Sequence, residues 1–189
     1  MPLQLGPSSA SYYRARYYDS SVGRFMSEDP SAFTDGIDFY VYVRNNPVLY
    51  FDPTGLTTYV GFSGEDLLDM ILAVERVEQT LKGKNCGGQS CAGPDAGKLL
   101  NALEGATFVF NPKSTDCGSV GPSDWVRHRI VIGPTAFGIG CCYKGSPLNA
   151  LPSTLLHETF HLLHIFPKEG GAFELEKNCF GCQRAPGQR

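Results

Sequence analysis

Two histidines and a glutamate stand close together in the segment LLHETFHLLH, residues 155–164. His157 and His161 are four residues apart, and Glu158 directly follows the first histidine. On an α-helix, residues four apart share one face, so both imidazoles can bind one metal ion from the same side. Glu158 can then take a proton from a water molecule at that metal. This H-E-x-x-H pattern is typical of zinc hydrolases, and above all of metallopeptidases.

The residues around the motif predict the helix that this chemistry needs. Leucines precede and follow the histidine pair, and Ser153 or Thr154, after Pro152, provides a plausible helix start. The competing interpretation is a structural core helix, in which both histidines are bonded to the backbone or to water.

A catalytic zinc site normally has three protein ligands and one open position. The third ligand must come from the residues that follow the motif, where a further helix is predicted over residues 168–180. The four candidates are His164, Glu169, Glu174 and Glu176. Glu169 is within reach if the first helix ends soon after His161, whereas a tight antiparallel hairpin favours Glu174. His164 ranks last, because three ligands along one short helix would leave the ion little open side.

An additional donor should stabilise the oxyanion that forms during peptide hydrolysis. Arg127, His128 and Tyr143 are candidates by residue type alone. Each of them is more readily explained as a structural or surface residue.

Periodicity predicts further elements ahead of the motif. A helix should begin after Ser63 and end at Gly83, with a second helix over residues 94–104. Short strands are predicted over residues 106–110 and 129–133, with residues 118–125 as loop between them. A small sheet flanked by helices, followed by the H-E-x-x-H helix, makes an α+β fold of the zincin kind.

Composition limits the classes of function. The net charge of −3 argues against a protein that binds nucleic acid by neutralising phosphates. No run of about eighteen apolar residues is present, so no membrane span is expected. The N-terminus, MPLQLGPSSASYY, lacks the basic and apolar regions of a signal peptide. If the protein is exported, we expect a specialised system to carry it.

All seven cysteines lie after residue 56 and allow three interpretations. One is a structural zinc site, which would use the residues Cys86, Cys91, Cys179 and Cys182. Another is a set of disulfides that join Cys141 or Cys142 to the C-terminal pair, as suits an exported protein. The third is scattered buried thiols. Because seven is odd, at least one cysteine has no partner within the chain.

The composition changes near residue 56, which predicts a boundary between segments 1–56 and 57–189. The first segment holds 11 of the 22 aromatic residues and neither cysteine nor histidine. Tyrosine-rich stretches alternate with turn signals, such as residues 19–23, and predict short strands. A segment of this size cannot bury so many aromatic rings alone, so it should belong to a larger β-assembly.

The stretch YYRARYYDSSVGRFMSEDPSAF, followed by YVYVRNNPVLYFDPTGL, resembles the C-terminal end of the conserved core of Rhs (rearrangement hotspot) repeat proteins. The similar region covers residues 11–56. The resemblance implies a β-shell that encloses a variable C-terminal toxin. In such proteins two D-P-x-G motifs, each followed by an apolar residue, mark the boundary. Here they are the segments 29–33 and 52–56, with Ala32 in place of the usual glycine.

The same resemblance implies autoproteolysis after Leu56, with Asp29 and Asp52 implicated as the pair of carboxylates. Two carboxylates that share a site can divide the acidic and basic roles between them. The alternative is that both Asp-Pro pairs only form turns.

The stretch EGGAFELEKNCF resembles the E-x-x-A pattern that follows H-E-x-x-H in gluzincin-like toxin peptidases, and this resemblance implies Glu169 as the third ligand. We therefore predict that residues 57–189 are a Zn²⁺-dependent metallopeptidase effector of an Rhs-type polymorphic toxin. It would hydrolyse a protein of a target cell after specialised export. The implied partners are the rest of the Rhs shell and a cognate immunity protein. The alternative is a non-peptidase toxin or a binding domain with a structural H-E-x-x-H helix.

Overall fold

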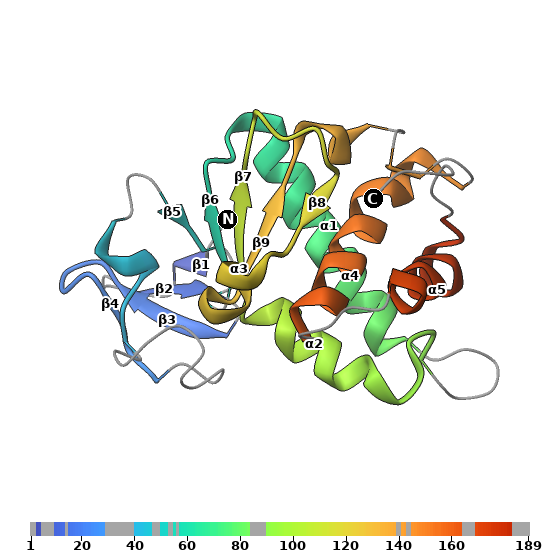
Figure 1. Ribbon diagram of the computed structural model, residues 1–189. Coiled ribbons are helices and arrows are strands. Elements are labelled where there is room, and N and C mark those ends of the chain that lie inside the picture. Colours follow the sequence, from blue (N-terminus) through green and yellow to red (C-terminus); the bar gives the residue numbers. More distant parts are fainter. Residues whose placement is uncertain are drawn as a thin grey trace.

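The described part of the chain folds around two β-sheets, each with its own hydrophobic cluster. The first sheet lies at the left of Figure 1, the second in the middle, and helices α4 and α5 at the right. The computed structural model describes residues 3–4, 10–13, 15–28, 40–46, 50–52, 55, 57–83, 90–138, 141–142, 145–163 and 169–182.

The first sheet is antiparallel and is built from the tyrosine-rich segment. Its strands, in order, are β1 (Leu3–Gln4), β2 (Ala10–Tyr13), β3 (Arg16–Asp19) and β4 (Arg24–Phe25). Phe25, Tyr42 and Val43 are buried, and the rings of Tyr13 and Tyr18 pack against them. The predicted turn over residues 19–23 connects β3 to β4. Asp19 closes that turn by accepting the amide hydrogen of Ser21 at 2.8 Å.

The second sheet contains three parallel strands with one antiparallel strand at each edge. The strand order is β5 (Tyr50–Phe51), β6 (Thr58–Val60), β7 (Thr107–Phe110), β9 (Arg129–Ile132) and β8 (Gly118–Ser119). Strands β6, β7 and β9 are parallel, whereas β5 and β8 run antiparallel to their neighbours. Because β8 ends this order, it forms one edge of the sheet among the described strands.

Among the described residues after strand β5, the chain forms five α-helices. They are α1 (Gly64–Lys82), α2 (Ala96–Glu104), α3 (Pro122–Arg127), α4 (Ala150–Leu163) and α5 (Glu169–Phe180). Helix α4 packs against α1, α2, α5 and strand β8. None of the helices in the described part of the chain is long and apolar enough to cross a membrane.

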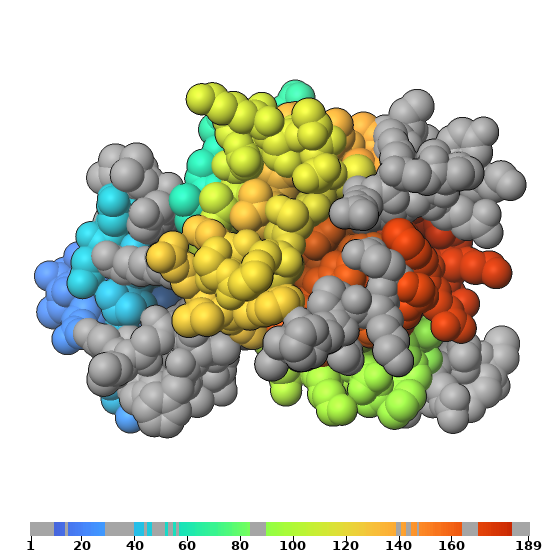
Figure 2. Space-filling model, in the orientation of Figure 1, coloured from blue at the N-terminus to red at the C-terminus, as the bar shows by residue number. Residues whose placement is uncertain are grey.

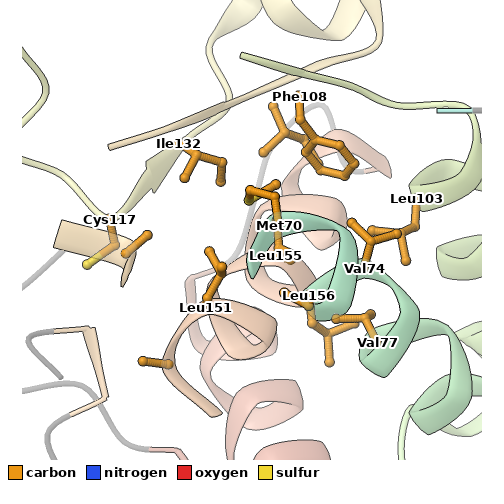
Figure 3. Packing of buried hydrophobic residues seen from close by; sticks show 14 of the residues in the cluster. Met70, Val74, Val77, Leu103, Phe108, Cys117, Ile132, Leu151, Leu155 and Leu156 are labelled. Atoms are coloured by element: carbon orange, nitrogen blue, oxygen red, sulfur yellow. The ribbon is translucent and has the colours of Figure 1, made fainter. Parts of the chain in front are cut away.

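The main hydrophobic core lies between the second sheet and helices α1, α2 and α4. Figure 3 shows Leu155 and Leu156 of α4 close to Met70 and Val77 of α1. Phe108 of β7 is fully buried in the same cluster. This core holds α4 in place, and the H-E-x-x-H motif with it.

Several predicted elements agree with the structure. Helix α1 ends at Gly83 as expected, although the predicted Ser63 cap makes no side-chain hydrogen bond to the helix. Strands β7 and β9 lie within the two predicted strand segments, and α5 begins one residue after the predicted start. The mixture of small sheets and helices agrees with the predicted α+β class.

The prediction of a loop over residues 118–125 was wrong, because this stretch forms strand β8 and most of helix α3. Strand β8 has two residues, which is too short for an alternating pattern. Helix α3 begins with Pro122, and Asp124 accepts the amide hydrogen of Gly121 at 2.9 Å. The two elements bring a sheet edge and a short helix to α4.

A buried arginine joins the second D-P-x-G segment to the first sheet. The Arg16 guanidinium lies 3.7 Å from the centre of the Phe25 ring and 3.8 Å from an Asp52 carboxylate oxygen. Asp52 accepts the amide hydrogens of Gly55 at 2.8 Å and Thr57 at 3.1 Å. Asp52 therefore closes the turn ahead of the predicted boundary.

Strand pairing continues across that boundary, since Tyr50 and Phe51 of β5 pair with Val60 and Tyr59 of β6. Of the residues implicated in autoproteolysis, Asp52 is buried, whereas Asp29 and Leu56 lie outside the described residues. Self-cleavage after Leu56 stays a prediction.

Six of the seven cysteines form three disulfides, which are Cys91–Cys179, Cys117–Cys141 and Cys142–Cys182. The pairing of Cys142 with Cys182 agrees with the disulfide interpretation of the sequence. A four-cysteine zinc site was the wrong alternative, because three of its proposed ligands are bonded to sulfur. Cys86 lies outside the described residues.

Candidate active site

The H-E-x-x-H residues lie in the second half of α4, which is buried on nearly all sides. His157, Glu158 and His161 are 2%, 3% and 6% exposed. The helix is buried because the core packs on one side of it and α5 on another. Burial of this degree makes the neighbours of each polar group important, since an ionisable group out of water needs a partner.

The two imidazoles face each other through the nitrogens that a metal would use. The Nε2 atoms of His157 and His161 are 2.9 Å apart, and the ring centres are 4.6 Å apart. This arrangement follows from the four-residue spacing on a helix, as predicted from the sequence.

Glu176 of α5 lies on the other side of the first imidazole. One of its carboxylate oxygens is 3.1 Å from Nδ1 of His157, and both side chains are almost completely buried. A carboxylate at this position favours a proton on Nδ1 and leaves the lone pair on Nε2, which points toward His161. Contacts of this kind orient metal-binding histidines.

We expect Glu176→Gln to weaken zinc binding about 10- to 100-fold, because glutamine removes the negative charge beside Nδ1. Competition with a chromophoric chelator measures the affinity. Glu174→Gln on the exposed side of the same helix is the matched control and should bind zinc like the wild type. Equal affinities in the two variants would argue against an orienting role for Glu176.

The two glutamates favoured as third ligand lie differently on α5. Glu174 is exposed and lines a surface hollow with Phe160 and Leu175, so the structure does not bring it to the histidine pair. The side chain of Glu169 lies outside the described residues. Glu169 is seven residues before Glu176, so two helical turns place both on one face of α5.

Glu169 as the third ligand therefore stays a prediction. Among the described side chains, no group of three or more His, Cys, Asp or Glu residues is arranged to hold a metal ion. The side chains of His164 and Glu169 are outside that set.

The two histidines themselves fit a zinc ion. A tetrahedral ion about 2.0–2.1 Å from each nitrogen sets two ligand nitrogens about 3.3 Å apart. The observed distance between the Nε2 atoms is 2.9 Å. A small rotation of the imidazoles would bring it to the separation that the ion requires. Paired imidazoles with a carboxylate behind one of them are the donor chemistry that zinc prefers.

Glu158 points toward strand β8, where Gly118 is its close neighbour. A Cβ atom built on Gly118 would lie 2.6 Å from Cγ of Glu158 and 3.1 Å from its carboxyl carbon. Gly118 is absent from the predicted site residues because its segment was predicted to be a loop. A glycine beside a catalytic side chain has no sequence signal unless the strand pairing is known.

Helix α3 is fastened to the end of α4. The Trp125 indole N–H donates a hydrogen bond of 3.0 Å to the carbonyl oxygen of His161. This carbonyl is among the last four of α4, which have no partner within the helix. In Figure 2, orange atoms of α4 are visible between the yellow segment around α3 and the red atoms of α5.

Of the three predicted oxyanion donors, two are described. His128 ends helix α3 in the left-handed conformation, and its Nε2 atom lies 3.2 Å from the carbonyl oxygen of Ala102. Arg127 is exposed, and Tyr143 lies outside the described residues. His128 thus has a structural role, at the end of α3, as the sequence favoured over a role as oxyanion donor.

Burial lowers the pKa of His128 below its ordinary value, although the hydrogen bond to Ala102 opposes this effect. The unfolded chain binds this proton near pH 6.5, and the folded chain binds it only at lower pH. Stability from His128 is therefore complete above about pH 6.5 and is lost as the pH falls toward the folded pKa.

Replacing His128 with Asn, which tolerates the left-handed conformation, should remove this dependence. We expect the stability advantage of the wild type over His128→Asn to shrink between pH 7.5 and pH 5.5. Urea unfolding of both proteins at each pH measures the difference between their free energies of unfolding. The contributions of the remaining histidines are the same in both proteins and cancel. An advantage that is constant or grows toward low pH would contradict the assignment.

Parts of the chain are similar to known proteins, some of which are toxins by name. Toxin subunit YenC1 of Yersinia entomophaga is 47% identical over 45 residues, which cover 24% of this chain and 5% of that protein. Toxin protein Tse5 of Pseudomonas aeruginosa is 47% identical over 45 residues, which cover 24% of this chain and 3% of its own length. Protein YibJ of Escherichia coli is 38% identical over 69 residues, 36% of this chain and 29% of that protein.

The chain spans less than a third of the length of each of these relatives. No protein-family model and no solved structure matches it. The partial relatives support the predicted resemblance to an Rhs-associated toxin. Each match is shorter than residues 57–189, so none covers the whole segment that contains the histidine pair.

Proposed function

We propose that residues 57–189 form the zinc-dependent peptidase domain of an Rhs-type toxin and hydrolyse peptide bonds in a protein of the target cell. The observation that carries this proposal is the pair of Nε2 atoms 2.9 Å apart on a buried helix, with Glu158 between the two histidines in sequence. A structural helix has no need of the Glu176 carboxylate buried behind His157. Burying a carboxylate is costly, so its presence beside His157 favours a functional role.

His157 and His161 would hold the zinc ion, with Glu169 as the proposed third ligand. Zinc at such a site acts as a Lewis acid that lowers the pKa of water and polarises a carbonyl group. Glu158 accepts the proton of the attacking water and passes it to the leaving amine. Glu176 keeps the His157 ring oriented throughout.

The sheet edge favours an extended peptide as substrate. Strand β8 ends the second sheet among the described strands, and its Gly118 lies against Glu158. An extended peptide that pairs with this edge through its main chain would pass beside the catalytic glutamate. Recognition through the main chain suits a peptidase, because the bond to be cut is itself part of that chain.

The toxin context comes from the N-terminal segment and from the partial relatives, which are toxin proteins by name. In this proposal residues 1–56 are the end of an encapsulating shell, and the chain is cut after Leu56 by Asp29 and Asp52. Asp52 accepts the amide hydrogen of Thr57. The nitrogen that carries this hydrogen belongs to the peptide bond that would be cut. The rest of the shell and a cognate immunity protein are the proposed partners, and specialised export delivers the toxin.

New peptide termini test the proposed activity directly. The purified full chain is incubated with a library of proteome-derived peptides in zinc, in excess chelator, and after zinc is restored. We expect new termini in the first and third samples and none in the second, identified by N-terminal labelling and mass spectrometry. The alternative, a binding domain with a structural helix, gives no new termini in any sample.

A further inference from the structure

We propose that Gly118 is the positioning residue for Glu158, because the absence of a side chain at residue 118 determines where the Glu158 carboxylate lies. This inference rests on the proposed function, in which Glu158 moves the proton. Gly118 would therefore act on catalysis through Glu158.

The contact between the two residues is closer than any side chain at residue 118 permits. A Cβ on Gly118 would lie 2.6 Å from Cγ of Glu158 and 3.1 Å from both its carboxyl carbon and Oε1. Ordinary carbon contacts begin near 3.4 Å, so even alanine requires a displacement of roughly 0.8 Å. The three nearest atoms all belong to the Glu158 side chain, so the base itself must give way.

The strand cannot easily move to relieve this contact. Gly118 pairs with Ile132 of β9, and the amide of Gly133 donates to the carbonyl oxygen of Cys117 at 3.1 Å. The preceding residue, Cys117, is also fixed by its disulfide to Cys141. Strand β8 is therefore held by its pairing with β9 and, at the preceding residue, by a disulfide.

The helix is equally constrained. Ser153, Thr154 and Leu155, on the turn before Glu158, are fully buried, and α4 packs against four other helices. In a close-packed interior, a local increase in volume displaces the atoms that it contacts, which here belong to the Glu158 side chain. A methyl group at residue 118 would thus turn the Glu158 side chain and leave the two backbones in place.

The backbone at residue 118 accepts alanine without strain, since its φ is outside the left-handed region that favours glycine. Gly118→Ala should therefore fold and bind zinc. Because a misplacement of about 1 Å can cost about 100-fold in rate, we expect kcat to fall about 100-fold. KM should stay within about threefold, because the peptide is proposed to pair with the main chain of β8, which alanine preserves.

The matched control is Gly97→Ala on helix α2, where a Cβ meets no atom within 4 Å. Both variants are compared with the wild type in kcat, KM, zinc stoichiometry and urea unfolding. The double variant Gly118→Ala with Glu158→Gln should be no slower than Glu158→Gln alone, because both changes act on one group. Wild-type kcat in Gly118→Ala, or additive losses in the double variant, would overturn the proposal.

A readout independent of hydrolysis separates this inference from the proposed function. The ¹³C carboxyl resonance of Glu158, assigned from its loss in Glu158→Gln, should shift in Gly118→Ala and not in Gly97→Ala. If the wild type hydrolyses nothing, the peptidase proposal fails. The resonance still shows whether residue 118 determines the position of the Glu158 carboxylate. An unchanged resonance in Gly118→Ala overturns the positioning role.

Discussion

Replacing Glu158 with glutamine is expected to reduce peptide hydrolysis about 100- to 10,000-fold while zinc stays bound, as for removal of a general base. Glutamine has nearly the same shape, so the close packing against Gly118 and the buried position on α4 are preserved. Its amide cannot accept the proton of the attacking water. Steady-state kcat/KM on a cleaved peptide, together with the zinc content of the same preparation, measures both parts of the expectation.

Glu174→Gln is the control for this substitution, because Glu174 is exposed on the neighbouring helix and lines a separate hollow. It should keep the activity of the wild type. Full activity in Glu158→Gln would end the peptidase interpretation, and loss of zinc in that variant would show a structural effect instead.

Removing the disulfide between Cys91 and Cys179 is expected to give the largest loss of stability. The two cysteines are separated by 88 residues, and a loop of that length corresponds to about 4–5 kcal/mol in the chain-entropy model. Cys179 is in the last turn of α5, the helix that carries Glu176, so this disulfide also fastens the contact to His157. Urea unfolding of Cys91→Ala with Cys179→Ala measures the loss, and the zinc affinity should fall with it.

The two single variants provide the internal control. A disulfide is lost when either partner is replaced, so Cys91→Ala, Cys179→Ala and the double variant should be destabilised nearly equally. Losses that add from the singles to the double variant, or that are absent, would contradict a bond between these cysteines.

The elements that the sequence predicted best are those with long periodic patterns or strong end signals. Helix α1 has the 3.6-residue periodicity and ends at Gly83, and α4 has two histidines four residues apart on a leucine-rich helix. These patterns are local, and the packing of α4 in the core preserves them. The H-E-x-x-H arrangement was predictable for the same reason.

Strand β8 was not predictable, because Gly118 and Ser119 have low strand propensity and two residues make no alternation. It exists because β9 supplies its hydrogen-bond partners, and a disulfide to Cys141 holds the preceding residue, Cys117. Both partners are distant in sequence. The residue that packs on Glu158 therefore became visible only with the fold.

The choice among three glutamates on α5 depended on how that helix lies against α4. A Cβ on Gly171 would be 2.8 Å from the Phe160 ring, so this glycine lets the two helices approach closely and sets their register. In that register Glu176 lies behind His157, and Glu174 faces solvent. Helical spacing places Glu169 and Glu176 on one face, but only the register tells which of them contacts the first histidine.

The stoichiometry of zinc binding is the most direct measurement of the central claim, that His157 and His161 hold a catalytic metal ion. The purified wild type is titrated with Zn²⁺ against a chromophoric chelator, beside Glu158→Gln and the double variant His157→Ala with His161→Ala. We expect one tightly bound zinc per chain in the wild type and in Glu158→Gln, and none in the double histidine variant. Wild-type protein that binds no zinc, or a double variant that still binds it tightly, would contradict the claim.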